Sequence, residues 1–377
     1  MEIEQTRTSA DLVAVRSPGR INIIGEHTDY NGGFVLPAAI DKEVIVRMRR
    51  NGSTDRCTLK ALDFDATFSF SLDHVQPQPA GWQNYLLGVV HEVLALGGKL
   101  SGFDAEISGN VPTGGGMSSS AALECSMGYA LNQLFALNLD DMQLIEIAQR
   151  AEHNFVGTKC GIMDMFASVK GKAGHVIRLD CRSLEYDYFP LELGEYELLL
   201  LNTNVSHSLA ESAYNQRREE CEEAVRILRQ TWPGIRQLRD VTVSMLEEAL
   251  PKLPNPIAQR CKHVVTENHR VKETTQALEQ GDLQRVGELL YASHRSLQHD
   301  YEVSCPELDF LVDKATQDPD ILGGRLMGGG FGGCTINLVR RAQSERIIEH
   351  MNAAYRKAFQ CDLTPYAVEL ADGTSKL

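Results

Sequence analysis

The chain has 377 residues, of which 43% are hydrophobic and 23% are charged, and these values are ordinary for a soluble globular enzyme. Its length favours two domains over one. The formal net charge of -14 argues against nucleic acid as a partner, because no basic face compensates for it. A protein of this charge must hold any phosphate ligand with local dipoles and a cation rather than with a broad positive field.

The termini, apolar runs and cysteines indicate where the protein works. Residues 1–11 are polar and acidic, so we expect no signal peptide. The longest apolar runs, such as 198–201, are far too short to span a bilayer. The nine cysteines are scattered and include no C-x-x-C pair, which argues against zinc and favours a reducing compartment. We therefore expect a cytoplasmic protein.

Residues 19–30, Gly-Arg-Ile-Asn-Ile-Ile-Gly-Glu-His-Thr-Asp-Tyr, hold the first cluster of polar side chains. Three isoleucines run into Gly25, so the pattern predicts a short buried strand that stops at a glycine turn. The side chains of residues 26–29 would then emerge together and bind several hydroxyls of one small polyol. For any one of these residues a solvated loop is an equal alternative, but it explains the whole cluster poorly.

The next segments predict strands and one helix. Residues 44–48 alternate as a strand does, and residues 63–70 form another predicted strand with Phe64, Phe68 and Phe70 on one face. Residues 82–96 carry apolar side chains at helical spacing.

A glycine-rich loop follows a predicted strand at 103–107. Residues 109–121 read Gly-Asn-Val-Pro-Thr-Gly-Gly-Gly-Met-Ser-Ser-Ser-Ala, and a helical apolar stripe begins directly after them. Glycines allow close approach of the backbone to a ligand, and a helix N-terminus attracts anions. This is not a Walker A loop, because no lysine follows the last glycine. The predicted anion-binding residues are Gly114, Gly115, Gly116, Met117, Ser118, Ser119 and Ser120.

Two carboxylates lie in the next segment. Asp140 or Asp141 can cap a predicted helix whose edge carries Glu152, a position that is usually at the solvent boundary. Glycines 157 and 161 end this helix, and Asp164 then lies among the apolar residues of 162–166. A carboxylate in such surroundings normally has a cationic partner or a catalytic role.

The second half of the chain is mostly helical. A strand is predicted at 196–202, followed by helices at 212–230, 241–250, 255–279 and 283–300. Tyr214 falls on the inner stripe of the first of these helices, where core packing is the usual role. Residues 323–335 are rich in glycine and lead into a predicted strand at 335–339.

The run at 19–30 resembles the galactokinase signature of the GHMP superfamily of small-molecule kinases. Two further superfamily motifs follow in order. Residues 112–121 match P-x-G-x-G-x-S-S-S-A with Gly115 in the variable place, and residues 323–335 match the motif beside the nucleotide site. The resemblance implies an α+β, two-domain GHMP kinase fold. It divides the chain into a ribosomal-S5-like domain at 1–185 and a ferredoxin-like domain at 186–377, with the active site in the cleft between them.

The resemblance also implies a reaction, in which ATP phosphorylates the C1 hydroxyl of α-D-galactose. Asp164 would take the hydroxyl proton, and Arg20 would offset charge on the phosphoryl group. Because Arg20 also favours ionised Asp164, a true base and an electrostatic anchor both remain open. The loop 114–120 would hold the ATP phosphates, and Ser120 and Glu152 would hold Mg²⁺. The implied sugar-binding residues are Glu26, His27, Thr28, Asp29 and Tyr214.

The resemblance also bears on the binding partners and on two alternative functions. We expect a monomer that binds galactose and ATP and has no nucleic-acid or membrane partner. In galactokinases the region of Trp82 stacks on adenine, although a tryptophan at a helix start is more often core. One rival is a kinase for N-acetylgalactosamine. The other is a catalytically dead galactose sensor, which is disfavoured because residues 118–121 and Asp164 are intact.

Overall fold

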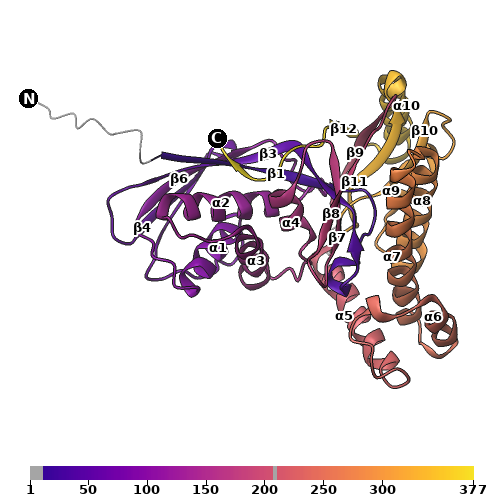
Figure 1. The fold of residues 1–377 in the computed structure, drawn as a ribbon. Helices are drawn as coiled ribbons and strands as arrows, with labels where there is room; N and C mark the ends of the chain where they lie inside the picture. Colours follow the sequence, from indigo (N-terminus) through magenta and orange to yellow (C-terminus); the bar gives the residue numbers. More distant parts are fainter. Residues whose placement is uncertain (1–11, 207–209) are drawn as a thin grey trace, which may run out of the picture.

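The computed structural model describes residues 12–206 and 210–377. Its N-terminal half is built on a six-stranded sheet of order β13-β1-β3-β6-β4-β5, to which the end of the chain contributes β13 (Ser375–Lys376). Helices α1 to α4 lie along one face of that sheet (Figure 1). Strand β1 pairs antiparallel with β3, with a register shift between Pro18 and Arg20. The elements of this half are β1 (Leu12–Asn22), β2 (Phe34–Val35), β3 (Pro37–Arg50), β4 (Arg56–Ala61), β5 (Ala66–Ser71), α1 (Gln83–Ala95), β6 (Phe103–Gly109), α2 (Ser119–Phe135), α3 (Asp141–Ala151), α4 (Met163–Lys170) and β7 (His175–Asp180).

Most predicted elements of this half are present. The side chain of Asp140 caps α3 and forms a capping box with Gln143, as one of the two predicted caps requires. The predicted strand at 63–70 is wrong at its start, because Leu62–Phe64 form a short 3-10 turn that ends at Asp65 with φ +47°. Strand β5 therefore begins at Ala66, and the Phe64 side chain is 65% exposed rather than aligned with Phe68 and Phe70.

The C-terminal half combines a four-stranded sheet of order β10-β11-β9-β12 with long helices, which lie on the right in Figure 1. A smaller sheet of order β2-β7-β8 combines two strands of the first half with β8 of the second. The elements are β8 (Tyr186–Pro190), β9 (Tyr196–Ser206), α5 (Ala210–Leu228), α6 (Val243–Ala249), α7 (Ile257–Glu279), α8 (Leu283–Ser296), α9 (Pro306–Ala315), β10 (Ile321–Leu326), β11 (Gly332–Arg340), α10 (Ser344–Phe359), β12 (Thr364–Val368) and β13 (Ser375–Lys376).

The two halves share a core, and a strand from the end of the chain joins the sheet of the first half. Strand β13, at the end of the chain, pairs with β1 in the first sheet, and Leu370 bridges to Ile40. One cluster of buried apolar side chains includes Ile24 from the first half and Met327 from the second. The division at residue 185 stays a prediction. Among the described residues, no helix combines the length and apolar character that a membrane span requires.

Candidate active site

A small cavity of about 120 Å³ lies where the turn after β1, the start of α4 and the glycine-rich segment after β10 meet. Its lining runs from Arg20 to Gly329, so both halves of the fold contribute to it. A larger cavity of about 800 Å³ lies between β7, β8 and α7, but no predicted site residue lines it. The predicted residues that line the small cavity are Arg20, Glu26, His27, Asp29, Glu152, Asp164 and Tyr214.

Thr28 is the one predicted sugar-binding residue that does not line this cavity. Its side chain is fully buried, and its hydroxyl donates to the carbonyl oxygens of Gly25 at 2.8 Å and Phe34 at 2.6 Å. Thr28 therefore closes the turn that presents its neighbours. Gly25 can make this turn because its φ of +101° lies in the region that favours glycine.

Arg20 and Asp164, which both line the cavity, form a two-pronged ion pair. The Nε and Nη2 atoms of Arg20 donate to the two carboxylate oxygens of Asp164, each at 2.7 Å. Nη1 donates to the carbonyl oxygen of Gly116 at 2.5 Å, and the Ser118 hydroxyl donates to Asp164. Burial opposes the charge of Arg20, but the charge of Asp164 prevails and raises the Arg20 pKa. One guanidinium thus connects this small cavity, the candidate sugar cavity, to residues 114–120, the candidate phosphate loop.

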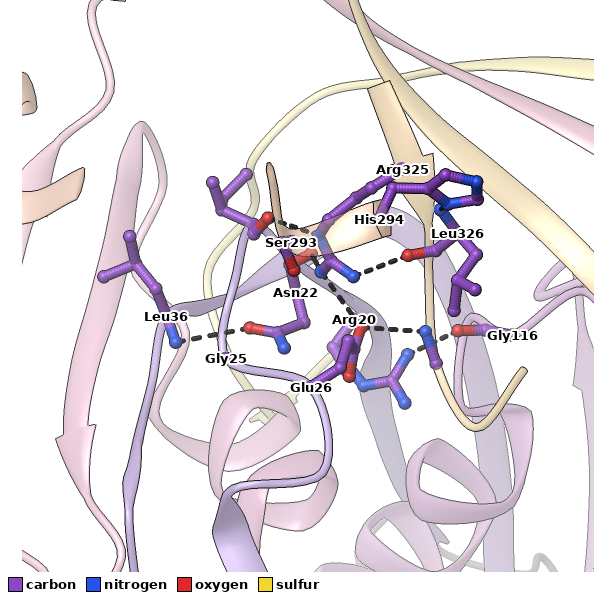
Figure 2. Close-up of polar contacts among 12 residues, drawn as sticks. Arg20, Asn22, Gly25, Glu26, Leu36, Gly116, Ser293, His294, Arg325 and Leu326 are labelled. Carbon is purple, nitrogen blue, oxygen red and sulfur yellow. Dashed lines mark hydrogen bonds and ion pairs between the residues drawn. The ribbon is translucent and has the colours of Figure 1, made fainter. Parts of the chain in front are cut away.

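Glu26 reaches across to the second half of the chain. Its Oε1 accepts a hydrogen bond from Arg325 Nη2 at 3.0 Å and one from the backbone N–H of Gly328 at 2.8 Å (Figure 2). Both Glu26 and Arg325 are buried, so this ion pair is shielded from water. Since Glu26 lines the cavity, its second oxygen, Oε2, is the one left for a ligand.

His27 is held by a group of aromatic rings. Its Nδ1 lies 2.8 Å from the Tyr30 hydroxyl, which in turn lies 2.8 Å from the Tyr301 hydroxyl. Its ring also packs against Tyr214, with centroids 5.4 Å apart. Burial, reinforced by the nearby His263, lowers the His27 pKa to about 3, so the ring is neutral. Nε2 is buried and has no partner among the described residues, which leaves it available to a sugar hydroxyl.

Asp29 also lines this cavity and lies in a short helical turn formed by Asp29–Asn31. Burial, followed by the charge of Asp164, raises its pKa to about 7. Gly161 packs so closely that a Cβ on it would lie 1.8 Å from Asp29 Oδ2. A carboxylate in this position gains from any ligand that donates hydrogen bonds to it.

The phosphate loop borders a second cavity, of about 640 Å³. Gly114 and Gly116 have φ of +72° and +71°, and the loop ends where α2 begins at Ser119. A Cβ on Gly116 would lie 2.9 Å from the carbonyl oxygen of Met327, so the third glycine-rich motif packs directly on this loop. The cavity is lined by Trp82, Tyr85, Gly114, Ser119 and Ser120 together with residues of β4 and β6.

Four residues of the loop do not line this cavity of about 640 Å³: Gly115, Gly116, Met117 and Ser118. The Met117 side chain is fully buried, while its carbonyl oxygen accepts the backbone N–H of Arg20 at 3.0 Å. Ser118 has φ +54° and turns its hydroxyl to Asp164. These residues therefore join the loop to the sugar cavity.

Glu124 is a buried carboxylate close to Glu152 and Asp164 that the sequence analysis did not single out. It lies one helical turn after Ser120 on α2, is fully buried, and neither carboxylate oxygen has a partner among the described residues. Burial, with the charges of Glu152 and Asp164, raises its pKa well above the usual value. The sequence does place Glu124 four residues after Ser120, a spacing that puts both side chains on one face of a helix.

Three family models match this chain. Residues 84–172 match the GHMP kinases N terminal domain, residues 274–357 match the GHMP kinases C terminal domain, and residues 4–50 match the galactokinase galactose-binding signature. A galactokinase of Thermotoga neapolitana is 43% identical over 363 residues, which cover 96% of this chain and 99% of the relative. A galactokinase of Roseiflexus sp. is 44% identical over 366 residues, covering 97% and 93%. The chain belongs to the galactokinase family.

Solved structures agree with this assignment. The crystal structure of Lactococcus lactis galactokinase complexed with galactose matches with a TM-score of 0.93 and 36% identity, covering 97% of this chain and 95% of that one. Methanococcus jannaschii mevalonate kinase matches with a TM-score of 0.68 over 97% of this chain and 100% of that one. At 18% identity the second match supports the fold alone. The GHMP kinase fold and membership of a kinase family are confirmed.

Proposed function

We propose that this member of the galactokinase family transfers the γ-phosphoryl group of ATP to the C1 hydroxyl of α-D-galactose. The products are galactose 1-phosphate and ADP, and the reaction is the first step of galactose catabolism. The observation that carries the proposal is the Arg20 guanidinium, which bridges Asp164 in the sugar cavity and Gly116 in the phosphate loop. Phosphoryl transfer needs mainly this kind of positioning and charge stabilisation.

The sugar cavity offers hydrogen-bonding groups that suit a small polyol. Glu26, His27, Asp29 and Tyr214 line a space of about 120 Å³, and His27 Nε2 has no partner among the described residues. Such groups are left unpaired by an analogue that lacks a hydroxyl, and this is the physical basis of specificity. The small volume favours galactose over N-acetylgalactosamine, which carries an additional acetamido group.

Asp164 is the proposed acceptor of the C1 hydroxyl proton. Its two oxygens are already bound by Arg20, and Ser118 donates to one of them. These hydrogen bonds fix the carboxylate in orientation, so a role as an electrostatic anchor is the second one that we propose for it. Arg20 is the proposed stabiliser of charge on the transferring group.

The donor set near the phosphate loop suits Mg²⁺. The Ser120 hydroxyl and Glu152 are the proposed ligands, and the buried Glu124, whose oxygens have no partner among the described residues, lies one helical turn after Ser120 on α2. Among the described residues, no group of three or more His, Cys, Asp or Glu side chains is arranged to hold a metal ion. Mg²⁺ keeps several waters and takes few protein ligands, so a sparse set fits it. When bound, the ion would neutralise charge on the β- and γ-phosphates.

Further proposals concern the domain boundary, the cellular compartment and the oligomeric state. We propose a boundary near residue 185, a cytoplasmic location and a monomeric state. All nine cysteines are free in the structure, as a reducing compartment requires. The intact run at 118–121 and the Arg20–Asp164 pair support an enzyme rather than a sugar sensor.

A coupled assay of ADP release across a panel of sugars tests the proposal. With ATP and Mg²⁺, we expect turnover of galactose, much slower turnover of its deoxy analogues and of glucose, and little turnover of N-acetylgalactosamine. Equal kcat/KM for galactose and glucose would refute the specificity. Preference for N-acetylgalactosamine would transfer the assignment to the sister kinase.

A further inference from the structure

Arg325 is the most completely buried cation near the sugar cavity, and no reaction step above uses it. It lies at the end of β10, its side chain is fully buried, and it does not line the cavity. Burial of an arginine is expensive unless every donor finds an acceptor. What Arg325 binds therefore indicates what it is for.

The contacts of Arg325 converge on the turn that presents the sugar-binding residues. Its Nε donates to the Ile23 carbonyl oxygen at 2.8 Å, and Nη2 donates to the Asn22 carbonyl oxygen at 2.5 Å. Nη2 also contacts Glu26 Oε1 at 3.0 Å, and Nη1 returns to the Leu326 carbonyl oxygen at 2.5 Å (Figure 2). One guanidinium from the second half thus holds both the backbone and the carboxylate of the first.

Glu26 is divided between two tasks by this arrangement. Oε1 is occupied by Arg325 and by the Gly328 N–H, so the carboxylate cannot rotate without breaking two buried hydrogen bonds. Oε2 is thereby the oxygen that remains for a ligand in the cavity that Glu26 lines. Gly328 follows Met327, whose carbonyl oxygen lies against Gly116 of the phosphate loop. The position of Glu26 is consequently tied to that of the third glycine-rich motif.

We propose that Arg325 is a positioning residue for sugar binding, which acts across the two halves of the chain by fixing the Glu26 carboxylate against Gly328. This inference rests on the proposed function, because it takes galactose as the ligand. Hydrogen bonds to a buried charge are among the stronger ones, and preorganised groups bind without reordering. A shortened or uncharged side chain at position 325 leaves Glu26 free to turn, which weakens galactose binding rather than the phosphoryl transfer itself.

A double-mutant cycle on galactose affinity separates positioning from a general structural role. Calorimetric titration with galactose alone is made on the wild type, Arg325→Lys, Glu26→Gln and the double variant. In the wild-type background, we expect Arg325→Lys to raise the Kd for galactose by about tenfold to a hundredfold. In the Glu26→Gln background, the same substitution should raise it by less than about twofold. An equal effect in both backgrounds, or no effect in either, overturns the proposal.

Arg260 supplies a matched control. It is also a buried arginine that binds two carboxylates, Glu220 and Glu302, and a carbonyl oxygen, that of Asp300, but it does not line the cavity. Arg260→Lys should lower the melting temperature and leave the galactose Kd within about twofold of wild type. A loss of affinity equal to that of Arg325→Lys would show that the effect is only lost stability, and this too overturns the proposal.

A measurement without position-325 variants covers the case in which they do not fold. Hydrogen exchange of the wild type should show that galactose protects the backbone amides of 327–330, because the Gly328 N–H donates to Glu26. Glu26→Gln should lose most of this added protection, and unchanged protection contradicts the proposal. If the wild type itself does not bind galactose, the proposed function fails, which is distinct from failure of the Arg325 assignment.

Discussion

Replacement of Asp29 by asparagine should remove the pH dependence that this residue imposes on stability. The Asp29 carboxyl has a pKa of about 7 in the folded protein, against an ordinary value of 3.8, because burial and the charge of Asp164 oppose its ionisation. Between these two values the folded state holds a proton that the unfolded state has lost. Stability therefore falls as pH rises through this window and becomes constant above about pH 7.

The size of the effect follows from the two pKa values. Each pH unit within the window removes about 1.4 kcal/mol, so the loss from pH 4 to pH 7 reaches about 4 kcal/mol for a fully dry carboxyl. Asp29 is half-buried, and solvent screening reduces this to about 2–4 kcal/mol. The amide of the replacement cannot ionise, so Asp29→Asn should be more stable than the wild type at pH 8 and similar to it at pH 4.

Thermal unfolding without sugar, nucleotide or Mg²⁺ checks this prediction. The quantity to follow is the difference in melting temperature between Asp29→Asn and the wild type, measured from pH 4 to pH 9. We expect the difference to grow up to about pH 7 and then to level off, while galactose affinity falls in the variant because an acceptor is lost. A difference that does not change with pH would refute the reasoning.

Three further variants test the proposed roles of the other carboxylates. Asp164→Asn should keep galactose binding and lower kcat by roughly 10²–10⁴-fold, the usual worth of general acid–base catalysis, and near-wild-type kcat in a single-turnover assay contradicts the role. Glu152→Gln should raise the Mg²⁺ concentration needed for half-maximal rate, and a superimposable titration curve removes it from the metal site. Glu124→Gln should raise the melting temperature of the ligand-free protein at pH 8, because the amide avoids the cost of protonating or burying a carboxylate, yet weaken Mn²⁺ binding measured by electron paramagnetic resonance. A variant that is less stable and binds Mn²⁺ normally shows a purely structural Glu124.

Local signals explain what was predictable in the site. The cluster at 26–29 follows an apolar run and a glycine, so its place at the end of a strand depends on a few neighbouring residues. The loop before α2 is equally local, since glycines precede a helical stripe directly. The cavity indeed brings Glu26, His27 and Asp29 together with Arg20.

Long-range packing explains what was not predictable. Arg325 contacts Glu26 across 299 positions of sequence, and nothing near either residue specifies that pairing. Thr28 has the same local setting as its neighbours, yet its hydroxyl satisfies two carbonyl oxygens of its own turn. Glu124 lies on a helix whose inward face was clear, but only the tertiary structure shows that, among the described residues, no partner meets its carboxylate.

The balance of charge in the site links composition to chemistry. Two buried arginines near the cavity are already paired with carboxylates, Arg20 with Asp164 and Arg325 with Glu26. The raised pKa values of Asp29 and Glu124 show that burial and neighbouring carboxylates oppose further negative charge there. A neutral sugar that donates hydroxyl hydrogen bonds relieves this repulsion at Asp29 without adding charge. ATP cannot do the same, because it brings phosphates into a protein of net charge -14. We therefore propose that its binding depends on the loop N–H groups at the start of α2 and on a divalent cation near Glu152.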